Sequence, residues 1–356
     1  MKAVVYEDIN RLVLKECEKP KLIEDTDVIL KVTTTTICSS DIHIKRGFVP
    51  RAVKGVVLGH EFVGVVEGKG AKVKNFNIGD RVAVNCETFC GECFYCKKGY
   101  VNNCIDKNGG WALGCRIDGG QGEYTRILFA DNCLTKIPDS VTDEEALFTG
   151  DLLSTGYWAC KIGEIEKDDT VVVIGAGPTG LCTLLNLKLH NPKKIIVIDV
   201  DENRLELVKK NSYADIVLNP LKVDIEKEIL KYTEGRGADR VFEVAGGEKT
   251  FDLALKIARP NATVVLVAMY EKDQALSLPN IYGKNLTIKF GGVDGCDCDK
   301  IMKYIEEKKI DATPLITHRM KFKDIMEAYE IFENKKDGVI KIAIDMKNRK
   351  INGLDI

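Results

Sequence analysis

The sequence has no apolar run long enough for a membrane-spanning helix, which needs roughly 20 consecutive apolar residues. Its N-terminal segment, MKAVVYEDIN, begins as an alternating strand and lacks the charged and apolar regions of a secretory signal. These absences argue against a membrane protein and against a secreted one. We therefore expect a cytoplasmic location.

The chain also lacks an excess of charge of one sign. It contains 52 Lys and Arg against 54 Asp and Glu, and the two signs are interspersed. A protein that binds nucleic acid or an acidic membrane surface usually carries a basic stripe, which is missing here. No internal repeat or low-complexity segment is visible. The length of 356 residues suggests about two domains, and the 45% hydrophobic content is ordinary for a globular protein.

Cysteine, in contrast, is abundant, with 13 in the chain. Without a secretory signal, metal ligands and buried thiols are more reasonable than a disulfide framework. Four of the cysteines have the spacing Cys90-x2-Cys93-x2-Cys96-x7-Cys104, which lets four thiolates surround one tetrahedral zinc ion. An iron-sulfur cluster or free thiols are the alternatives, but the bacterial ferredoxin run has its fourth Cys sooner and followed by Pro. The spacing therefore predicts a closed, structural zinc site.

The strand and helix patterns divide the chain into three parts. Residues 1–138 contain many short strand-like segments separated by Gly, Asp and Asn, which predicts a mostly β structure. Residues 155–292 alternate strands with helical patterns, which predicts βαβ units and a parallel sheet. The remainder, 300–356, offers helices and a final strand within 338–346, which we assign to the first domain. The predicted fold class is therefore α/β.

A glycine-rich turn follows the first strand of the alternating region. The pattern Gly175-x-Gly177-x-x-Gly180 comes directly after the apolar residues 171–174 and opens a helix, and the next strand ends in Asp199. Such glycines let the backbone approach a pyrophosphate at a helix N-terminus, and the acidic residue accepts hydrogen bonds from the adenosine ribose. Because Asp199 would repel a 2′-phosphate, the sequence favours NAD(H) over NADP(H). The alternative is that Asp199 is only a turn residue at a strand end.

A second group of metal-ligand residue types lies between Cys38 and Gly64. Cys38 follows an alternating run and His60 follows the apolar residues 56–58, so we expect both at strand ends. A thiolate and a neutral imidazole favour zinc, and a catalytic zinc has three protein ligands and one open position. The third ligand has to come from elsewhere in the chain. The alternative is a buried thiol and a hydrogen-bonded imidazole with no metal.

Together these motifs resemble the zinc-containing medium-chain alcohol dehydrogenase family across essentially the whole chain. The resemblance rests on Gly59-His60-Glu61, the four-cysteine motif, GAGPTG, Asp199 and the segment GDLLSTGYWA. It implies a GroES-like β-barrel catalytic domain that encloses a Rossmann doubly wound parallel sheet, with the active site in the cleft. The implied boundaries are 1–154 for the catalytic domain with its structural zinc lobe, 155–292 for the dinucleotide-binding domain and 293–356 for the return to the catalytic domain.

The resemblance also implies roles around a catalytic zinc. It makes Cys38, His60 and Asp151 the ligands, with Asp151 where the liver-type enzymes have Cys, and Glu61 an acidic neighbour that can swing onto the metal. The alternative for Asp151 is a helix cap at the domain junction. The other implied roles are a proton relay of Ser40 and His43, Asp41 orienting the zinc-bound imidazole, Thr155 near the nicotinamide, Lys341 at a cofactor phosphate, and Pro178, Thr179 and Arg204 beside the three glycines.

The resemblance is mixed where the substrate pocket is concerned. Asp151 and Trp111 are similar to the bacterial secondary-alcohol enzymes, whereas GGQGEYTRILFADNCLTKIPDS and GDLLSTGYWA are similar to the formaldehyde dehydrogenase branch. An aromatic wall favours apolar alcohols over polyols. The candidates for the pocket wall are Cys86, Trp111, Met269 and Tyr270.

We therefore expect an NAD-dependent zinc alcohol dehydrogenase that reversibly oxidises a secondary or apolar alcohol, with one catalytic and one structural zinc per chain. Alternatives within the same fold are a hydroxysteroid, polyol or formaldehyde dehydrogenase. An alternative of another class is a nucleotide-sensing binding protein that has lost the chemistry. The expected partners are a small-molecule alcohol or ketone and further copies of the chain, as a tetramer or dimer, with neither nucleic acid nor membrane.

Overall fold

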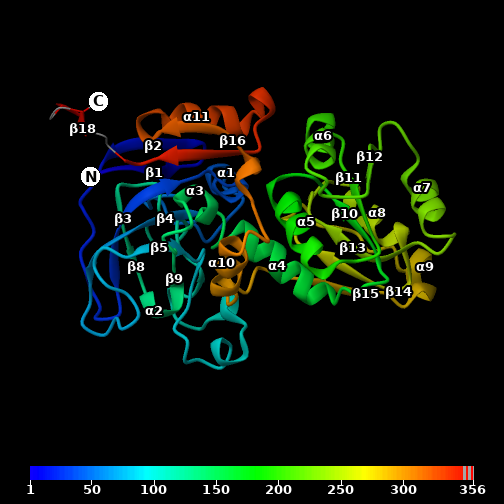
Figure 1. The fold of residues 1–356 in the computed structure, drawn as a ribbon, viewed down its shortest axis with the longest axis horizontal. Coiled ribbons are helices and arrows are strands. Elements are labelled where there is room, and N and C mark those ends of the chain that lie inside the picture. Colours follow the sequence, from blue (N-terminus) through cyan, green and yellow to red (C-terminus); the bar gives the residue numbers. More distant parts are fainter. Residues whose placement is uncertain (348–349, 352–353, 356) are drawn as a thin grey trace. The chain divides into compact units, whose positions relative to one another are not determined.

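The structure is a computed structural model that describes residues 1–347, 350–351 and 354–355. It divides into two compact units, Met1–Ser154 together with Asp294–Ile356, and Thr155–Val293. In Figure 1 the first unit includes the blue N-terminal and the red C-terminal ribbons, and the second unit is green to yellow. Residues 348–349, 352–353 and 356, which we expected in the returning segment, lie outside the described residues. No helix in the described part of the chain is long and apolar enough to cross a membrane.

A seven-stranded sheet forms the centre of the first unit. The strands of this unit are β1 (Lys2–Asp8), β2 (Arg11–Glu16), β3 (Val28–Thr35), β4 (Phe62–Lys69), β5 (Arg81–Val84), β6 (Glu87–Thr88), β7 (Gly110–Trp111), β8 (Tyr124–Ile127), β9 (Leu134–Lys136), β16 (Ile316–Lys321), β17 (Lys341–Asp345), β18 (Lys350–Ile351) and β19 (Leu354–Asp355). The sheet order is β16-β17-β3-β4-β5-β9, and β8 also pairs with β3. Ile344 on β17 pairs with Thr35 on β3, so the C-terminal part of the chain returns to the sheet of the N-terminal part.

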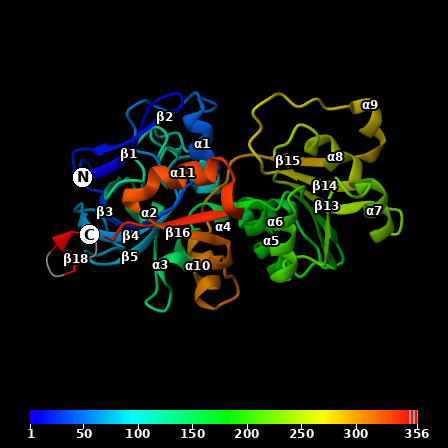
Figure 2. The same cartoon turned by 90° about the horizontal axis from the view of Figure 1, so that it is seen from above.

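Short helices accompany this sheet. They are α1 (Ser39–Lys45), α2 (Ala130–Cys133), α3 (Asp143–Ala146), α10 (Cys298–Glu306) and α11 (Ile325–Glu333), with single 3-10 turns η1 (Cys96–Lys98), η2 (Val101–Asn103), η4 (Thr313–Leu315), η5 (Phe322–Asp324) and η6 (Lys336–Gly338). α11 packs beside β16 and β17. Figure 2 shows α11 next to β16. The boundary between the two units falls inside α4 (Leu152–Gly163).

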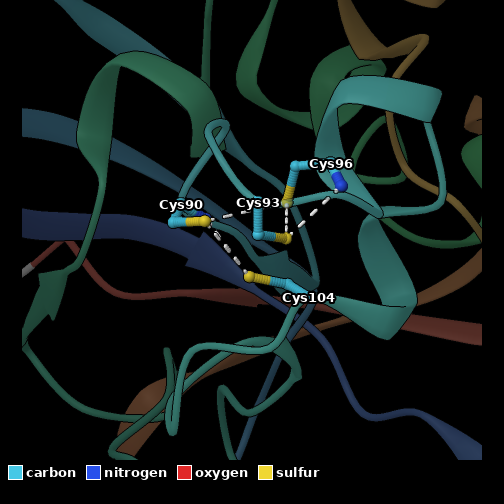
Figure 3. Close-up of side chains that lie close together, drawn as sticks. All are labelled: Cys90, Cys93, Cys96 and Cys104. Atoms are coloured by element: carbon cyan, nitrogen blue, oxygen red, sulfur yellow. Dashed lines mark hydrogen bonds between the residues drawn. The ribbon is translucent and has the colours of Figure 1, made fainter.

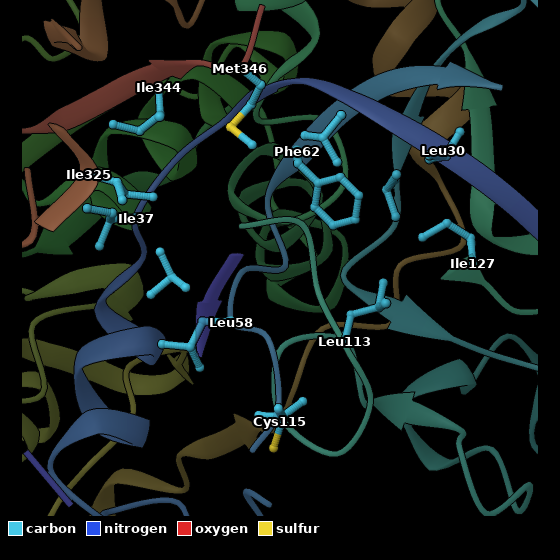
Figure 4. Close-up of a cluster of buried hydrophobic side chains, with 14 of the residues drawn as sticks. Leu30, Ile37, Leu58, Phe62, Leu113, Cys115, Ile127, Ile325, Ile344 and Met346 are labelled. Atoms are coloured by element: carbon cyan, nitrogen blue, oxygen red, sulfur yellow. The ribbon is translucent and has the colours of Figure 1, made fainter. Parts of the chain in front are cut away.

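The apolar faces of the strands form the core of the first unit. Leu30 on β3, Phe62 on β4 and Ile127 on β8 are buried, and α11 adds Ile325 to the same cluster (Figure 4). Burying a side chain of this size stabilises a fold by roughly 1.5–3 kcal/mol. The loops that leave these strands are therefore anchored at their ends by well-packed residues.

The second unit contains a six-stranded sheet. Its elements are β10 (Thr170–Ile174), β11 (Lys194–Ile198), β12 (Ile216–Leu218), β13 (Ala238–Glu243), β14 (Ala258–Leu266), β15 (Thr287–Phe290), α5 (Pro178–His190), α6 (Glu202–Lys210), α7 (Ile225–Tyr232), α8 (Thr250–Ile257), α9 (Leu278–Ile281) and the 3-10 turn η3 (Tyr282–Lys284). The order is β12-β11-β10-β13-β14-β15, and every pair is parallel. Every residue of β10 is buried, which is typical of a strand with both faces covered. The predicted α/β class with a doubly wound parallel sheet is confirmed.

Some local features differ from the sequence-based expectation. Cys38 does not end a strand but precedes α1, a seven-residue helix too short to give a clear helical period. His60 comes just before β4 instead of after a strand, because residues 56–58 form only an isolated bridge between Val5 and Val57. The sequence pattern predicts neither α7 nor β16. The expected positions of Cys38 and His60 at strand ends were therefore wrong. The two residues proposed for the site stay the same.

Candidate active site

Cys38 stands where the backbone turns from β3 into α1. Its extended conformation makes it the residue before the first helical turn, and its N–H donates a 2.9 Å hydrogen bond to Asp41 Oδ2. An acidic side chain that reaches back to the N-cap N–H stabilises the start of a helix. Cys38 itself is buried, so its thiol is held by a packed helix start and not by a mobile loop.

His60 and Glu61 form the turn that leads into β4, and both are buried. Gly59 before them has a φ of +95°, and a Cβ atom there would lie 2.7 Å from Gln121 Cγ. A side chain at this position would be strained and would collide, so glycine is required. The close approach of the Gly59 and Gln121 segments fixes the position of the neighbouring His60 imidazole.

Asp151 reaches the same place from the residue before α4. Its Oδ2 atom lies 3.3 Å from His60 Nε2 and 3.7 Å from Cys38 Sγ. One ligand atom from each of Cys38, His60, Glu61 and Asp151 lies within 4.8 Å of the others. Three segments far apart in the sequence thus bring a thiol, an imidazole and two carboxylates together.

This set of donor atoms fits a zinc ion. Zinc accepts thiolate, imidazole and carboxylate ligands, and a catalytic site uses three of them. Glu61 Oε2 is buried and has no hydrogen-bond partner among the described residues, as expected where a cation would sit. Glu61 Oε1 is already bonded to Lys341, whereas Asp151 contacts both Cys38 and His60. The geometry therefore favours Cys38, His60 and Asp151 as the three ligands, with Glu61 beside them.

The ionisation of these groups is strongly perturbed. Burial raises the pKa of Cys38 to about 11 and the pKa of Glu61 to about 7. Burial acts to raise the pKa of Asp151, but the hydrogen bond to His60 and the positive charges of His60 and Lys341 together lower it to about 2. Burial would lower the pKa of His60, yet the hydrogen bonds to Asp151 and Asp41 raise it well above its usual value. Zinc requires a thiolate and a neutral imidazole, so metal binding would release protons from Cys38 and His60.

A chain of buried polar groups lies behind His60. Asp41 Oδ1 lies 3.5 Å from His60 Nδ1, and Asp41 Oδ2 accepts a 3.0 Å hydrogen bond from Gln121 Nε2. Tyr329 O–H in turn donates a 2.6 Å hydrogen bond to Gln121 Oε1. Such partners orient a metal-binding imidazole. The sequence points to Asp41, but it misses Gln121 and Tyr329, because contacts 80 and 208 positions apart leave no local signal.

Lys341 occupies a different environment from the one we expected. Its ammonium group donates hydrogen bonds to Glu61 Oε1 at 2.9 Å and to the Ile37 carbonyl at 2.8 Å. The side chain is completely buried. It lies on β17, which pairs with β3 inside the sheet. The expectation that Lys341 binds a cofactor phosphate is not met in this structure, since the ammonium group is buried and already paired.

The four cysteines of the second motif converge in a lobe that contains η1 and η2. Their sulfur atoms point toward one another (Figure 3), with 3.4 Å between Cys93 and Cys96, 3.6 Å between Cys90 and Cys104 and 3.9 Å between Cys90 and Cys96. All four lie within 4.8 Å of one another. Hydrogen bonds from backbone N–H groups lower the pKa of Cys93 to about 6, which favours a thiolate. Four thiol ligands fill a tetrahedral zinc site, so this one would be closed to substrate.

The glycine-rich turn lies between β10 and α5. Gly175 has a φ of +108°, and a Cβ atom on Gly180 would lie 2.0 Å from the Gly175 carbonyl oxygen, so both positions require glycine. Asp199, at the end of β11, accepts a 2.6 Å hydrogen bond from the Ala176 N–H, which fixes its carboxylate beside the turn. Arg204 Nη1 lies 3.8 Å from Asp199 Oδ2. The predicted cofactor residues, with Pro178 and Thr179 in the first turn of α5, thus form one group.

The remaining predicted residues fall into two groups. Around the metal-ligand cluster, Ser40 Oγ lies 3.7 Å from Cys38 Sγ, His43 follows on the same helix, and Cys86 is buried with its N–H bonded to the Gly150 carbonyl. The Trp111 ring contacts the His60 ring edge-to-face, with 5.5 Å between their centres. In the second unit the structure places Thr155 on α4, Met269 with 47% of its surface exposed, and Tyr270 with its O–H donating to Glu243. The proposed roles of these residues stay predictions.

A parallel sheet with a glycine-rich turn, an open cluster of metal ligands and a closed cage of four thiols place the protein in the class of zinc-dependent dehydrogenases. Sequence comparison agrees with this class. Residues 24–139 match the alcohol dehydrogenase GroES-like domain, and residues 178–305 match the zinc-binding dehydrogenase family. The chain belongs to the zinc-containing medium-chain alcohol dehydrogenase family, as its motifs suggested, and is an oxidoreductase acting on CH–OH groups.

Individual relatives cover nearly the whole chain. An alcohol dehydrogenase from Cupriavidus necator is 34% identical over 97% of this chain and 98% of its own length. The solved apo form of zinc-dependent alcohol dehydrogenase 2 from Streptococcus pneumoniae is 37% identical, with a TM-score of 0.91 over 99% of this chain and 100% of that one. An alcohol dehydrogenase (rspB) from Escherichia coli CFT073, solved with the cofactor NADH, is 30% identical, with a TM-score of 0.88 over 97% and 99% of the two chains.

Proposed function

We propose that this alcohol dehydrogenase transfers a hydride reversibly between a secondary or apolar alcohol and NAD(H). The observation that carries the proposal is the convergence of Cys38, His60 and Asp151 beside the Trp111 ring. These three residues offer a metal site with an open position, and the ring offers an apolar surface next to it. Small-molecule sites combine such an apolar wall with a few well-placed polar groups.

Cys38, His60 and Asp151 would hold the catalytic zinc, and Cys90, Cys93, Cys96 and Cys104 the structural one. A zinc ion at the first site would supply Lewis acidity that makes the hydroxyl group of the substrate easier to deprotonate. Asp41 lies beside Nδ1 of His60 and keeps the imidazole in position. Ser40 accepts the proton that the substrate loses, and His43, one helical turn further along α1, passes it on toward solvent.

The glycine-rich turn and Asp199 are proposed to bind NAD(H). The turn presents backbone N–H groups at the start of α5, where an anionic pyrophosphate is favoured. The Asp199 carboxylate is held beside that turn and would accept hydrogen bonds from the adenosine ribose. The E. coli relative solved with NADH supports this assignment.

The test is an NADH-formation assay on the zinc-loaded protein with formaldehyde and with alcohols of graded size, including primary, secondary, steroid and polyol substrates. We expect the highest kcat/KM for secondary or apolar alcohols. A higher value for a steroid, for polyols or for formaldehyde would assign the corresponding alternative. Zinc and NADH binding with no turnover on any of these compounds would contradict the proposal and favour a nucleotide-sensing binding protein.

We also propose that the chain forms a homo-oligomer, a tetramer or a dimer. This follows from the family resemblance. Light scattering coupled to size-exclusion chromatography measures the assembled mass directly, and a mass equal to that of one chain would contradict it.

A further inference from the structure

An arginine side chain lies one aromatic ring away from the zinc-binding imidazole. The Arg51 guanidinium carbon lies 5.0 Å from the centre of the Trp111 ring, and that ring in turn contacts His60 at 5.5 Å. A guanidinium stacks well on the face of an indole. Arg51, Trp111 and His60 therefore form a continuous row that begins at the surface, because Arg51 is exposed, and ends at the buried metal ligand.

The segments that carry Trp111 and Arg51 are anchored in the structure. Trp111 lies on β7, and Ala112, which follows it, is completely buried. Leu113 and Cys115 are also completely buried and belong to the core of the first unit (Figure 4). The Cys115 carbonyl accepts a 2.8 Å hydrogen bond from the N–H of Val53, two positions after Arg51. The segments that carry the arginine and the tryptophan are thus tied to each other by the main chain.

The row contains one cation without an ion-pair partner and one buried N–H without an acceptor. Arg51 forms no ion pair within the described part of the chain. It lies over the Trp111 ring, hydrogen-bonds the Cys115 thiol and interacts through its charge with Glu87. Trp111 Nε1 is buried and also lacks a partner there. A buried indole N–H normally finds an acceptor. A cation and an unpaired N–H side by side, next to a metal site, suit a ligand that carries a negatively charged oxygen.

The carboxyl group of Glu87 is near enough to Arg51 for their charges to interact, but the two form no ion pair in the described part of the chain. Glu87 pairs with Trp111 across β6 and β7 and is only 1% exposed. Burial, and then the negative charge of Asp294, raise its pKa well above the usual value. Burial therefore disfavours the anionic form of Glu87, which makes it a poor partner for the positive charge of Arg51.

We propose that Arg51 and Trp111 select an alcohol that carries a carboxylate group, with its hydroxyl at the zinc and its carboxylate at the guanidinium. A guanidinium binds a carboxylate through two parallel hydrogen bonds, and one cation balances one monoanion. The carbon skeleton of such a hydroxy acid packs on the Trp111 ring. The ring therefore still serves as the apolar wall described under the proposed function. This inference rests on that proposed function and names its substrate class.

The test compares 4-hydroxypentanoate with 2-pentanol, which share the carbon skeleton and the position of the hydroxyl group. For the wild type we expect a kcat/KM at least tenfold higher for the hydroxy acid, mainly through a lower KM. Arg51→Gln should reduce the ratio of the two kcat/KM values at least tenfold, and Arg51→Lys, which keeps the charge, should reduce it less. Arg11→Gln is the matched control, because Arg11 is an exposed arginine on β2, and it should leave the ratio unchanged.

A binding measurement separates recognition from turnover. The ketone product, 4-oxopentanoate, should quench the fluorescence of Trp111 in the wild type and bind at least tenfold more weakly to Arg51→Gln. Trp158, the other tryptophan, is buried in the second unit and gives a constant background. Added salt should weaken binding to the wild type more than binding to Arg51→Gln, because it screens the guanidinium charge.

A wild-type ratio near one, or an Arg51→Gln variant that lowers both kcat/KM values equally, would overturn the inference and leave Arg51 a structural residue. In that case oxidation of 2-pentanol would still support the proposed function. Failure of the wild type on every alcohol tested would instead contradict the proposed function itself.

Discussion

Lys341 and Glu61, 280 positions apart in the chain, form an ion pair with 2.9 Å between Nζ and Oε1, and each side chain is only 1% exposed. A buried pair of this kind costs much desolvation energy, and removing one partner leaves the other charge uncompensated. The pair therefore matters to the fold as well as to the site, because it occupies one carboxylate oxygen of Glu61 beside Cys38, His60 and Asp151.

Lys341→Met should lower the free energy of unfolding by about 3–5 kcal/mol, because Glu61 then remains as an unpaired buried group. The double variant Lys341→Met with Glu61→Gln should recover much of this loss. Urea unfolding followed by circular dichroism measures both. Equal stability of the single and the double variant would mean that the pair contributes nothing beyond packing.

Asp151→Ala tests the third zinc ligand. Zinc content should fall from two ions per chain toward one, and kcat should fall by several orders of magnitude, because an uncoordinated hydroxyl keeps its high pKa. Ser40→Ala is the control, since it should keep both ions and slow turnover. NADH binding should persist in both variants. Two zinc ions and near-normal turnover in Asp151→Ala would move the third ligand to Glu61.

Cys96→Ser tests the four-cysteine lobe. Losing one thiolate should release the structural zinc and lower the melting temperature together, because metal binding and folding of such a lobe are coupled. Metal analysis and thermal unfolding on the same sample provide the measurement. Cys296→Ser, at an exposed cysteine outside the cage, should change neither. Full metal content with an unchanged melting temperature in Cys96→Ser would contradict the existence of the cage.

Asp199→Gly tests the choice of cofactor. Removing the carboxylate should reduce the ratio of kcat/KM for NAD to that for NADP, because the ribose loses an acceptor and the 2′-phosphate loses a repelling charge. Arg204, 3.8 Å from Asp199, would then be free to attract that phosphate. Steady-state kinetics with both cofactors provide the measurement. A wild type that prefers NADP would show that the role assigned to Asp199 is wrong.

Glu87 should make stability depend on pH. Its folded pKa lies well above the unfolded value of 4.5, mainly because it is buried, so the folded state binds a proton that the unfolded state releases. Stability should therefore fall as the pH rises above 4.5, by about 1.4 kcal/mol per unit, until the folded pKa is reached. Glu87→Gln should lose this dependence and unfold at a higher temperature at neutral pH. Parallel pH profiles of melting temperature for the two proteins would exclude this role.

Short-range patterns were sufficient for the parts of the protein that lie within one segment. The spacing of Cys90, Cys93, Cys96 and Cys104 predicts a cage because a short loop can bring all four sulfur atoms together, and the structure does so. The glycines of the turn before α5 are equally local, since each is required by a backbone angle or a close approach within the turn. The alternating parallel sheet also follows from the succession of strand and helix patterns.

The sequence alone thus determined the fold class, the four-cysteine motif and the cofactor turn, because periodicity and spacing act between neighbouring residues. The assignment of Asp151 to the other metal site came from the family resemblance, because Asp151 lies 113 positions from Cys38. Only the tertiary structure decided which distant side chains share one environment. It enclosed Lys341 beside Glu61, placed Gln121 and Tyr329 behind Asp41, and stacked Arg51 on Trp111. These contacts depend on the pairing of β17 with β3 and on the packing of separate loops on one core. Local sequence patterns do not encode such long-range pairings.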